Sequence, residues 1–499
     1  MKNSMLHVAL IKCRFLGVIF IIGGLSGCVS YSENWDHMPA VGINDIKITP
    51  STINNDSTLT TLPSSINIQA THEYSLVELI DLSQNSNPQL RMAWQQAKQA
   101  AINSELIKTT FLPRVSANVV GGYLKNDFDL TDSIHVDTNT KSIIPNLSLQ
   151  WLIFDFGQRS DLLSSNDHLV SALKYNFYLA NQAFVQNVTT AYFSYNQIVK
   201  ERIFAEQVLD KTVEIEKAVK KKNQLGLATL VEVAQAEQLV SESKLNHVLK
   251  KNNEKNSYQL LLKAMGLNPL MKINIKMDEN RVLPKNINVS ADKWIDIALA
   301  NRPDILASYE MVKNTKANVS MIEKDYFPKV FLGGNLSRNH SNWGVQNFSD
   351  SNQTSNNSNV FLGIYIPLYS GGSSNLKIAQ AKSLEQESIE QFNKIKNNAA
   401  NEIVIAINTL NSELESYQSA INLTKTAEVT YNASFASYKQ GFATITQVNE
   451  SMKGLIYAKQ IESQTYTASL IAASNLAFLL GFVTNSEQIL NNRFLPAIQ

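Results

Sequence analysis

The stretch NQLGLATLVEV at residues 223–233 has a near copy, YKQGFATITQV, at residues 438–448. Gly226 and Gly441 hold the same place in the two copies and lie 215 residues apart (441−226). A glycine after a helical run commonly occupies the C′ position, where a positive φ ends the helix. Each copy therefore predicts the end of a helix.

A capping box follows each glycine. Thr229 with Glu232, and Thr444 with Gln447, match the S/T-x-x-E/Q spacing in which two side chains satisfy the free backbone N–H groups of a new helix. The duplicated phrase is thus predicted to be the tip of a helical hairpin, present twice.

Four further landmarks repeat in the same register, which predicts that a large unit is duplicated. Three pairs are 215 residues apart and the fourth is 214 apart: Asn87-Pro88 with Arg302-Pro303, Leu112-Pro113 with Phe327-Pro328, Gly266-Leu267 with Gly481-Phe482, and WLIFDFGQ (151–158) with YIPLYSGG (365–372).

Each unit has the same predicted order of helices, so helix should dominate the fold. The long runs 157–222 and 372–437 contain 66 residues each without a proline, and at about 1.5 Å per residue each would extend roughly 100 Å. Opening helices at about 88–111 and 303–326 and return helices at about 229–264 and 444–479 are shorter. One opening helix stacked on one return helix would flank most of a long helix.

Alternating apolar residues predict two strands between the opening and long helices of each unit. The alternating sets are Val115, Ala117, Val119 and Tyr123; Ile143, Leu147, Leu149, Trp151 and Ile153; Val330, Leu332 and Leu336; and Val360, Leu362, Ile364, Ile366 and Leu368. The polar stretches 125–142 and 337–359 are predicted to be long hairpin loops. Strands of roughly 10 residues with one apolar face and terminal aromatics are typical of a membrane barrel, which needs at least about 8 strands. Four strands would therefore require an oligomer, and a small water-soluble sandwich is the alternative.

The N-terminus resembles a secretory signal. Lys12 and Arg14 precede the apolar run Phe15–Leu25, which is too short to span a membrane comfortably. The run ends in Leu25-Ser26-Gly27-Cys28, which resembles a bacterial lipobox, so Cys28 is the predicted lipidation site, palmitate included. The alternative is a signal peptide that merely contains a cysteine. After Cys28 the sequence predicts no transmembrane helix and, because no second cysteine remains, no disulfide.

The composition argues against nucleic acid and against an enzyme. With 44 Lys+Arg and 43 Asp+Glu, the formal charge of +1 gives no electrostatic case for binding nucleic acid. The seven histidines are scattered, and none has metal-ligand spacing to another. Walker A, H-E-x-x-H and G-x-S-x-G motifs are missing from the sequence. We therefore expect no cofactor, no metal site and no catalytic residue.

Several motifs, in this order and spacing, resemble those of the TolC family of outer-membrane efflux ducts. They are the lipobox, the Asn87-Pro88 and Arg302-Pro303 openings, the F-L-P and Y-F-P strand starts, the IFDFGQR and IPLYSGG helix starts, and both Gly-x-Ala-Thr tips. The resemblance covers about 75–485. It implies a homotrimer whose 12-stranded barrel, four strands per subunit, crosses the outer membrane and continues as an α-helical coiled-coil tunnel in the periplasm. Lipid on Cys28 would resemble the lipoprotein branch, and Val29 after it fits release to the outer membrane.

The resemblance divides the chain into six parts. They are a signal peptide (1–27), an N-terminal tether (28–74), the first repeat (75–270), a linker (271–290), the second repeat (291–485) and a C-terminal tail (486–499).

The resemblance also implies roles for the tips. A periplasmic adaptor, which joins the duct to an inner-membrane pump, would dock there on Gly226, Leu227, Ala228, Thr229, Gly441, Phe442, Ala443 and Thr444. The alternative is that these residues only cap and turn. Relatives carry two acidic residues at the positions of Gln447 and Glu450, which would ring the closed pore. Because position 447 is Gln here, the cation preference of the constriction should be weaker.

Three other functions remain open at this point. A type I secretion duct would share the fold and pass unfolded protein instead of small molecules. A lipid-tethered periplasmic coiled-coil scaffold would explain the helices but not the four strands, and a lipoprotein enzyme is the third alternative.

Overall fold

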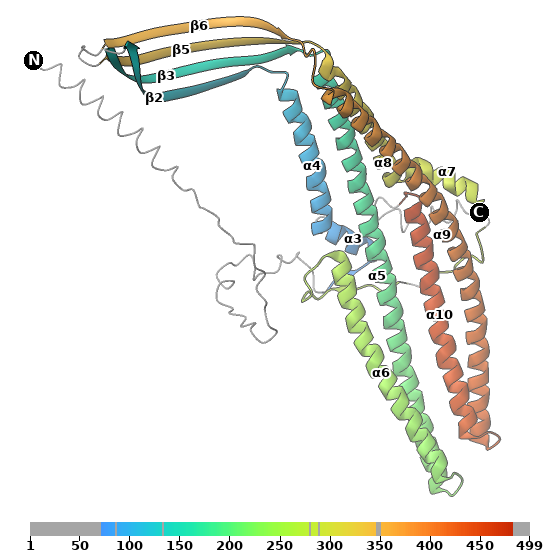
Figure 1. Ribbon diagram of the computed structural model, residues 1–499. Helices are drawn as coiled ribbons and strands as arrows, with labels where there is room; N and C mark the ends of the chain where they lie inside the picture. Colours follow the sequence, from blue (N-terminus) through green and yellow to red (C-terminus); the bar gives the residue numbers. More distant parts are fainter. Residues whose placement is uncertain are drawn as a thin grey trace, which may run out of the picture. The chain divides into compact units, whose positions relative to one another are not determined.

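The computed structural model describes residues 71–84, 87–131, 134–278, 281–287, 290–345 and 351–482 (Figure 1). The chain divides into Met1–Leu62 and Pro63–Gln499, and every described residue belongs to the second unit. The predicted signal peptide, Cys28 and the tether as far as residue 70 lie outside the described residues. No helix of the described part is both long and apolar enough to cross a membrane.

Two halves of the described chain run through the same elements in the same order. The first half consists of α3 (Leu76–Gln84), α4 (Pro88–Thr109), β2 (Arg114–Thr131), β3 (Ile134–Phe154), α5 (Gln158–Gln224) and α6 (Leu230–Met265). The second half consists of α7 (Ala291–Asn301), α8 (Pro303–Glu323), the 3₁₀ turn η1 (Lys324–Tyr326), β5 (Lys329–Val345), β6 (Ser351–Tyr365), α9 (Ser373–Gln440) and α10 (Ile445–Leu479). Short strands β1 (Glu73–Tyr74) and β4 (Asn274–Ile275) pair in parallel beside them.

The six predicted helices are confirmed, and α5 and α9 are the long ones, with 67 and 68 residues. α4 and α6 both pack against α5, and in Figure 1 they follow each other along it. α5 also packs against α8 and α10, and these pack against α9. Toward the strands the helices are therefore arranged as α4–α5–α8–α9, and toward the tips as α6–α5–α10–α9.

The predicted long loops were wrong, because most of residues 125–142 and 337–359 are strand. β2, β3, β5 and β6 form one antiparallel sheet in that order, with 15 to 21 residues per strand. The pairing continues as far as Thr131↔Ile134 in the first hairpin, past an irregularity between Asp129 and Thr131, and as far as Trp343↔Ser351 in the second. Backbone N–H and C=O groups need partners whatever the side chain is, so the ladders continue where the apolar alternation stops.

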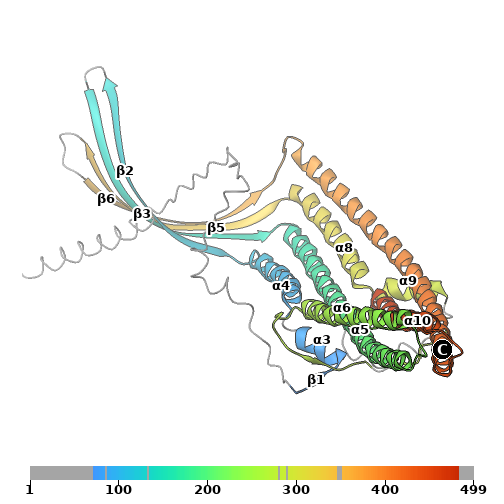
Figure 2. The same ribbon diagram turned by 90° about the horizontal axis from the view of Figure 1, so that it is seen from below.

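The two faces of the sheet differ in chemistry and exposure. One face, here called the outer face, carries the predicted apolar alternation, and register places Val115, Leu149, Gly334 and Val360 in one row across it. The opposite, inner face carries mainly polar residues: Ser116, Asn118, Asn146, Ser148, Asn335, Ser337, Asn357 and Asn359. Along β3 the outer-face residues 141, 143, 145 and 147 are exposed, while 142, 144, 146 and 148 are half-buried. The sheet is curved (Figure 2). Because the strands mainly contact one another, we infer from the half-buried inner-face residues that the inner face is the concave one.

A left-handed corner joins the sheet to each long helix. Gly157 and Gly372 have φ of 85° and 84°, and before them Phe156 (52°) and Gly371 (65°) also have positive φ. In the first half, Asp155 accepts hydrogen bonds from the backbone N of Gly157 (3.2 Å) and of Arg159 (3.0 Å). The DFG triplet at 155–157 is therefore a strand-to-helix corner.

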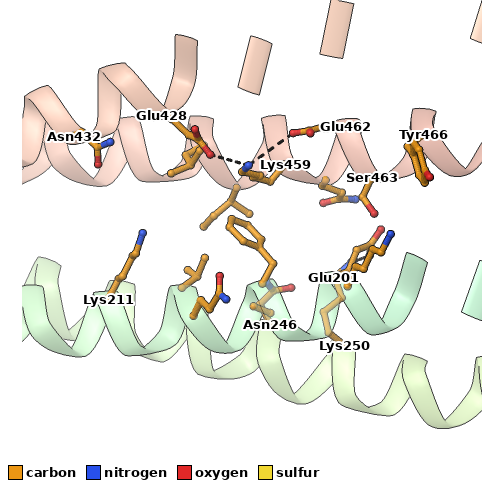
Figure 3. Close-up of a pocket in the computed structure, with 18 of the residues that line it drawn as sticks. Glu201, Lys211, Asn246, Lys250, Glu428, Asn432, Lys459, Glu462, Ser463 and Tyr466 are labelled. Atoms are coloured by element: carbon orange, nitrogen blue, oxygen red, sulfur yellow. Dashed lines mark hydrogen bonds and ion pairs between the residues drawn. The ribbon is translucent and has the colours of Figure 1, made fainter. Parts of the chain in front are cut away.

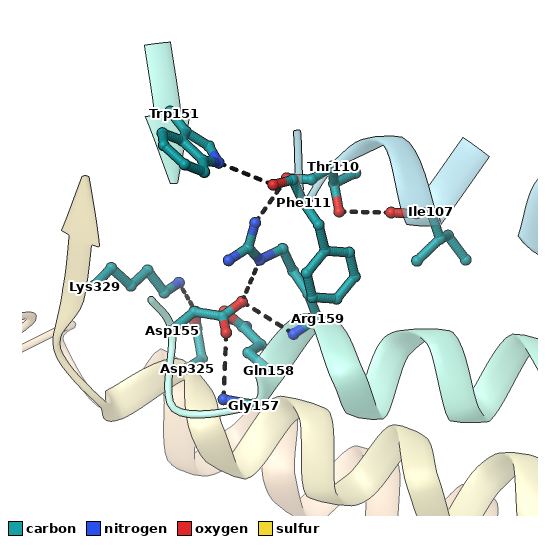
Figure 4. Close-up of polar contacts among 10 residues, drawn as sticks. All are labelled: Ile107, Thr110, Phe111, Trp151, Asp155, Gly157, Gln158, Arg159, Asp325 and Lys329. Carbon is teal, nitrogen blue, oxygen red and sulfur yellow. Dashed lines mark hydrogen bonds and ion pairs between the residues drawn. The ribbon is translucent and has the colours of Figure 1, made fainter. Parts of the chain in front are cut away.

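Arg159 ties this corner to the start of β2 (Figure 4). Its guanidinium donates to Asp155 at 2.7 Å and to the Thr110 carbonyl at 2.7 Å, and it lies 4.6 Å from the centre of the Phe111 ring. Trp151 donates from its ring nitrogen to the Phe111 carbonyl at 2.9 Å. Both strands of the hairpin are thus fixed where they meet the helices.

Candidate functional site

Both hairpin tips have the backbone geometry that their shared phrase predicts. Gly226 and Gly441 have φ of 70° and 84°. The N of Leu227 donates to the Lys222 carbonyl at 2.8 Å, and the N of Phe442 donates to the Ser437 carbonyl at 2.9 Å. These six-residue closures are Schellman bonds, which end a helix on a left-handed residue.

Both predicted capping boxes are present. Thr229 and Thr444 accept from the backbone N of Glu232 (3.2 Å) and Gln447 (3.3 Å). In return, the side-chain oxygens of Glu232 and Gln447 accept from the backbone N of the two threonines at 2.7 and 2.9 Å. The side chain of Gln447 therefore serves as a helix cap, which an acid at this position would do equally well.

The tips expose large apolar side chains. Leu227 is 72% exposed and Phe442 is 84% exposed, although the backbone N of each donates a hydrogen bond that closes its turn. Leu225, Leu230 and Val231 are also more than 60% exposed. Contiguous exposed apolar residues of this kind mark binding surfaces more often than they mark free surface.

One apolar core holds the two hairpins together just behind the tips. It is formed by Val208, Ile215 and Val219 of α5, Ala236 and Leu239 of α6, Tyr431 and Tyr438 of α9, and Ile445, Val448, Met452 and Leu455 of α10. Burial raises the pKa of the Tyr438 phenol, so this ring stays neutral. The tips are therefore placed by packing among all four helices.

Lys222 connects the α5 tip to the α9 tip. Its ammonium donates to the Tyr438 carbonyl at 2.7 Å and lies 4.2 Å from the centre of the Tyr438 ring. Lys220 connects α5 to α6 through Glu216 (2.6 Å) and Glu237 (2.8 Å), and its hydrogen bonds to Glu216 and then Glu237 raise its pKa. No local sequence pattern identifies these partners of Lys220 and Lys222.

Gln447 and Glu450 line a groove of about 860 Å³ between α9 and α10. Its other walls are mostly small side chains, including Ala427, Ala433, Ala443 and Gly454. Both Gln447 and Glu450 are exposed. The two predicted constriction residues thus lie one helical turn apart, on the side of the second hairpin that its own packing leaves open.

A polar hollow of about 470 Å³ separates the two hairpins farther from the tips (Figure 3). Lys459 of α10 pairs there with Glu428 (2.7 Å) and Glu462 (3.8 Å), and Lys250 pairs with Glu201 (2.6 Å). Apolar cores lie on both sides of this hollow along α5. Each of these ion pairs lies within one hairpin, Lys459–Glu428 and Lys459–Glu462 in the second and Lys250–Glu201 in the first. A hollow separates the hairpins at this level, so they can shift there at less cost than in a packed core.

No group of three or more His, Cys, Asp or Glu side chains suited to a metal ion occurs in the part of the chain that the structure describes.

Comparison with known proteins assigns the fold. The sequence profile of the family described as outer membrane efflux protein matches twice, at residues 79–267 and 294–482. This chain belongs to that family, the family of TolC. Its two matched segments begin 215 residues apart (294−79), the same separation as the Gly226 and Gly441 tips.

Individual relatives of this family member are distant but cover most of its length. The cation efflux system protein CusC of Escherichia coli O157:H7 is 22% identical over 78% of this chain and 84% of its own. The outer membrane protein TolC of Escherichia coli K12 is 22% identical over 84% of both chains. Among solved structures, the CmeC outer membrane channel of Campylobacter jejuni superposes with a TM-score of 0.70 at 18% identity, covering 82% of this chain and 86% of its own.

Proposed function

We propose that the protein is the outer-membrane exit duct of a tripartite efflux system. It would be a passive homotrimeric channel, through which small molecules pass from an inner-membrane pump and a periplasmic adaptor to the outside. Family membership supports this proposal, since the named relatives are efflux proteins and outer-membrane channels. Energy would come from the pump, and the duct itself would catalyse no reaction.

One observation carries the proposal: the sheet and the array of helices both end in open edges, and these edges lie on the same two sides. Among the described residues the sheet ends at β2 and β6, and its outer backbone groups have no strand partner there. The helical array ends at α4 and α6 on the side of β2 and at α9 on the side of β6. Long unpaired strand edges are aggregation hazards unless they are covered or closed.

Closure between copies removes both edges at once. If β6 of one copy pairs with β2 of the next, α9 meets the neighbour's α4 and α6 in the same ring. Such head-to-tail contacts close into cyclic oligomers. Three copies give 12 strands, within the range of outer-membrane barrels, continued by a helical tunnel.

The outer face of the sheet fits lipid. We call its apolar residues the apolar band: Val115, Ala117, Val119 and Tyr123 of β2; Ile143, Leu147 and Leu149 of β3; Leu332 and Leu336 of β5; and Val360, Leu362 and Ile364 of β6. Val115 of β2 and Val360 of β6 lie in one row of the sheet. In β2 the other residues of the apolar band lie farther from the helices than Val115, whereas in β6 they lie nearer the helices than Val360. The band therefore slants across the register, as it must when strands tilt by about 35–45° in a closed barrel.

We assign adaptor docking to the tips, on Gly226, Leu227, Ala228 and Thr229 and on Gly441, Phe442, Ala443 and Thr444. The exposure of Leu227 and Phe442 supports this role. The pore constriction would be formed by Gln447 and Glu450, the lipid anchor by Cys28, and the repeats by 75–270 and 291–485.

The first experiment is to measure the native mass and conductance of the protein extracted from outer membranes in mild detergent. We expect a trimer that forms channels in planar bilayers. A monomer, or a protein recovered from the soluble periplasm, would contradict the duct.

Docking at the tips is tested with Gly226→Asp and Gly441→Asp. No atom lies within 4 Å of a Cβ added at either glycine, and Asp tolerates positive φ better than most residues, so the trimer should form. We expect export to be lost, whereas Asn252→Asp, on the exposed surface of α6, should leave it intact. Export that survives both glycine changes would remove the tips from this role.

A further inference from the structure

Cations border the apolar band at its end away from the helices. On β2, the first outer-face residue beyond Tyr123 is Lys125; on β3, the first beyond Ile143 is Lys141; on β5, the first beyond Leu336 is Arg338. On β6, Ser358 takes the corresponding place. We call Lys125, Lys141 and Arg338 the basic collar.

The basic collar follows the slant of the band. Lys125 is paired in register with Asn139, Lys141 is two residues nearer the helices along β3, and Arg338 lies nearer still on β5. When tilted strands bring the band to one level, they bring these three side chains to one level as well. The basic collar thus lies at the boundary where the apolar surface meets water.

The opposite boundary of the band is aromatic. Phe154, Phe156 and Phe327 form a chain of ring contacts at the helical end, with centroids 4.7 and 5.6 Å apart. Aromatic girdles mark membrane–water interfaces generally. Three cations at this end are paired with carboxylates: Arg159, Lys324 and Lys329 lie 2.6–2.9 Å from Asp155, Asp161 and Asp325. At the far end, by contrast, Lys125 has only a 3.5 Å contact with Asp127. This asymmetry indicates that the two interfaces contact different headgroups.

The basic collar is accessible and only weakly neutralised. Lys125, Lys141 and Arg338 are all exposed. Lys125 lies 3.5 Å from Asp127, but the two side chains are 52% and 47% exposed, so the pair is screened and weak. Asp137, opposite Asp127, lies farther from the band than Lys125 and Lys141. An anionic group at the edge of the band would therefore meet three cations before it meets a carboxylate.

We propose that the basic collar binds the phosphate groups of a phosphorylated glycolipid in the outer leaflet of the outer membrane. This inference rests on the proposed function, which puts the helices on the periplasmic side and the basic collar on the outer side. The lipid tails would cover the apolar band while the headgroup phosphates accept hydrogen bonds from Lys125, Lys141 and Arg338. The guanidinium can bind a phosphate through two N–H groups, whereas the two lysines act as point charges.

The test is a titration of the full-length protein in mild detergent with lipid A, followed by native mass spectrometry. We compare the parent with Lys125→Gln/Lys141→Gln/Arg338→Gln and with a control that removes three exposed lysines elsewhere, Lys244→Gln/Lys272→Gln/Lys425→Gln. Hydrogen bonds to charged groups are stronger than those between neutral groups, and the loss of even one lowers affinity about tenfold or more. We therefore expect affinity to fall at least about tenfold in the collar variant and to stay unchanged in the control.

Two further ligands identify the chemistry. Lipid A stripped of its phosphates should bind the parent as weakly as the collar variant binds intact lipid A, and inorganic phosphate should not compete at equal concentration. Arg338→Lys, which keeps the charge but loses the contact through two N–H groups, should lower the affinity less than Arg338→Gln does.

The conductance of each variant distinguishes a failure of the lipid-binding inference from a failure of the proposed duct function. Equal lipid affinity in parent and collar variant, or an equal loss in the control, would overturn the inference while leaving a conducting trimer intact. A parent protein that forms no conducting trimer would overturn the proposed function and the inference with it.

Discussion

Gly226 and Gly481 both adopt positive φ, but their surroundings differ. A Cβ at Gly226 would meet no atom within 4 Å, whereas at Gly481 it would come 2.7 Å from the Asn301 carbonyl oxygen. Gly226→Ala should therefore cost only the left-handed backbone penalty, about 1–2 kcal/mol. Gly481→Ala should cost more, because a backbone atom has to move.

Thermal unfolding in detergent provides the comparison for these two glycines. We expect the melting temperature to fall in the order parent, Gly226→Ala, Gly481→Ala. Equal losses for the two variants would show that the contact with Asn301 does not constrain the junction of α10.

Glu450 is the single acid of the proposed constriction, since position 447 is Gln. Glu450→Gln should abolish the cation preference of the closed channel, measured as reversal potential across a salt gradient in planar bilayers. Gln447→Glu should strengthen the preference, because it adds a second acidic ring. Unchanged selectivity in both variants would remove these residues from the pore.

The backbone conformation of Phe156 could not be predicted from the sequence, unlike that of the tip glycines. The glycines at 226 and 441 were predicted to end helices, and the structure confirms both. A positive φ at Phe156 has no signal in its own residue type, because only its counterpart Gly371 in the second half is a glycine. Ring contacts with Phe154 and Phe327, which come from other elements, accompany this conformation.

At the scale of elements, Lys222 links the ends of α5 and α9. Lys222→Met removes its hydrogen bond and its cation–π contact with Tyr438 while keeping most of the aliphatic length. The link holds the first hairpin against the second, so we expect its loss to loosen the tips and raise single-channel conductance. Lys221→Met, at the exposed neighbouring position, is the matched control.

Conductance that stays at the parent value in Lys222→Met would show that the apolar core behind the tips is sufficient to hold them. A rise in both lysine variants would point to surface charge instead of the link.

Helices were predictable to within a few residues, and the strands were not. The predicted and observed bounds of α6, 229–264 and Leu230–Met265, differ by one residue at each end, because capping boxes and glycines are local signals. The outer halves of the strands are rich in Asn, Ser and Thr, as in β6. Their pairing depends on neighbouring strands, so no apolar periodicity reports it. The Lys222–Tyr438 link depends on how two helices are rotated against each other, which sequence spacing leaves undetermined.

At the scale of the whole chain, the two faces of the sheet should respond differently to charge. Leu147 is on the outer face and Ser148, next to it in β3, is on the inner face. An arginine facing lipid costs about 2–4 kcal/mol at mid-depth, so Leu147→Arg should reduce the amount of trimer recovered from outer membranes. Ser148→Arg should assemble normally and alter conductance only.

Assembly of both variants in normal amounts would contradict the assignment of the outer face to lipid. Failure of Ser148→Arg alone would place lipid on the opposite face.

The length of the strands affects where exported compounds are released. β3 has 21 residues, which extend roughly 70 Å at about 3.3 Å per residue and rise roughly 50 Å when tilted by about 45°. The hydrocarbon core is only about 30 Å thick. In the proposed placement the polar ends of the strands would raise the mouth of the duct clear of the lipid. Hydrophobic compounds would then be released into the surrounding medium, where dilution competes with their re-partitioning into the membrane. A smaller fraction of the exported molecules would therefore re-enter the cell envelope.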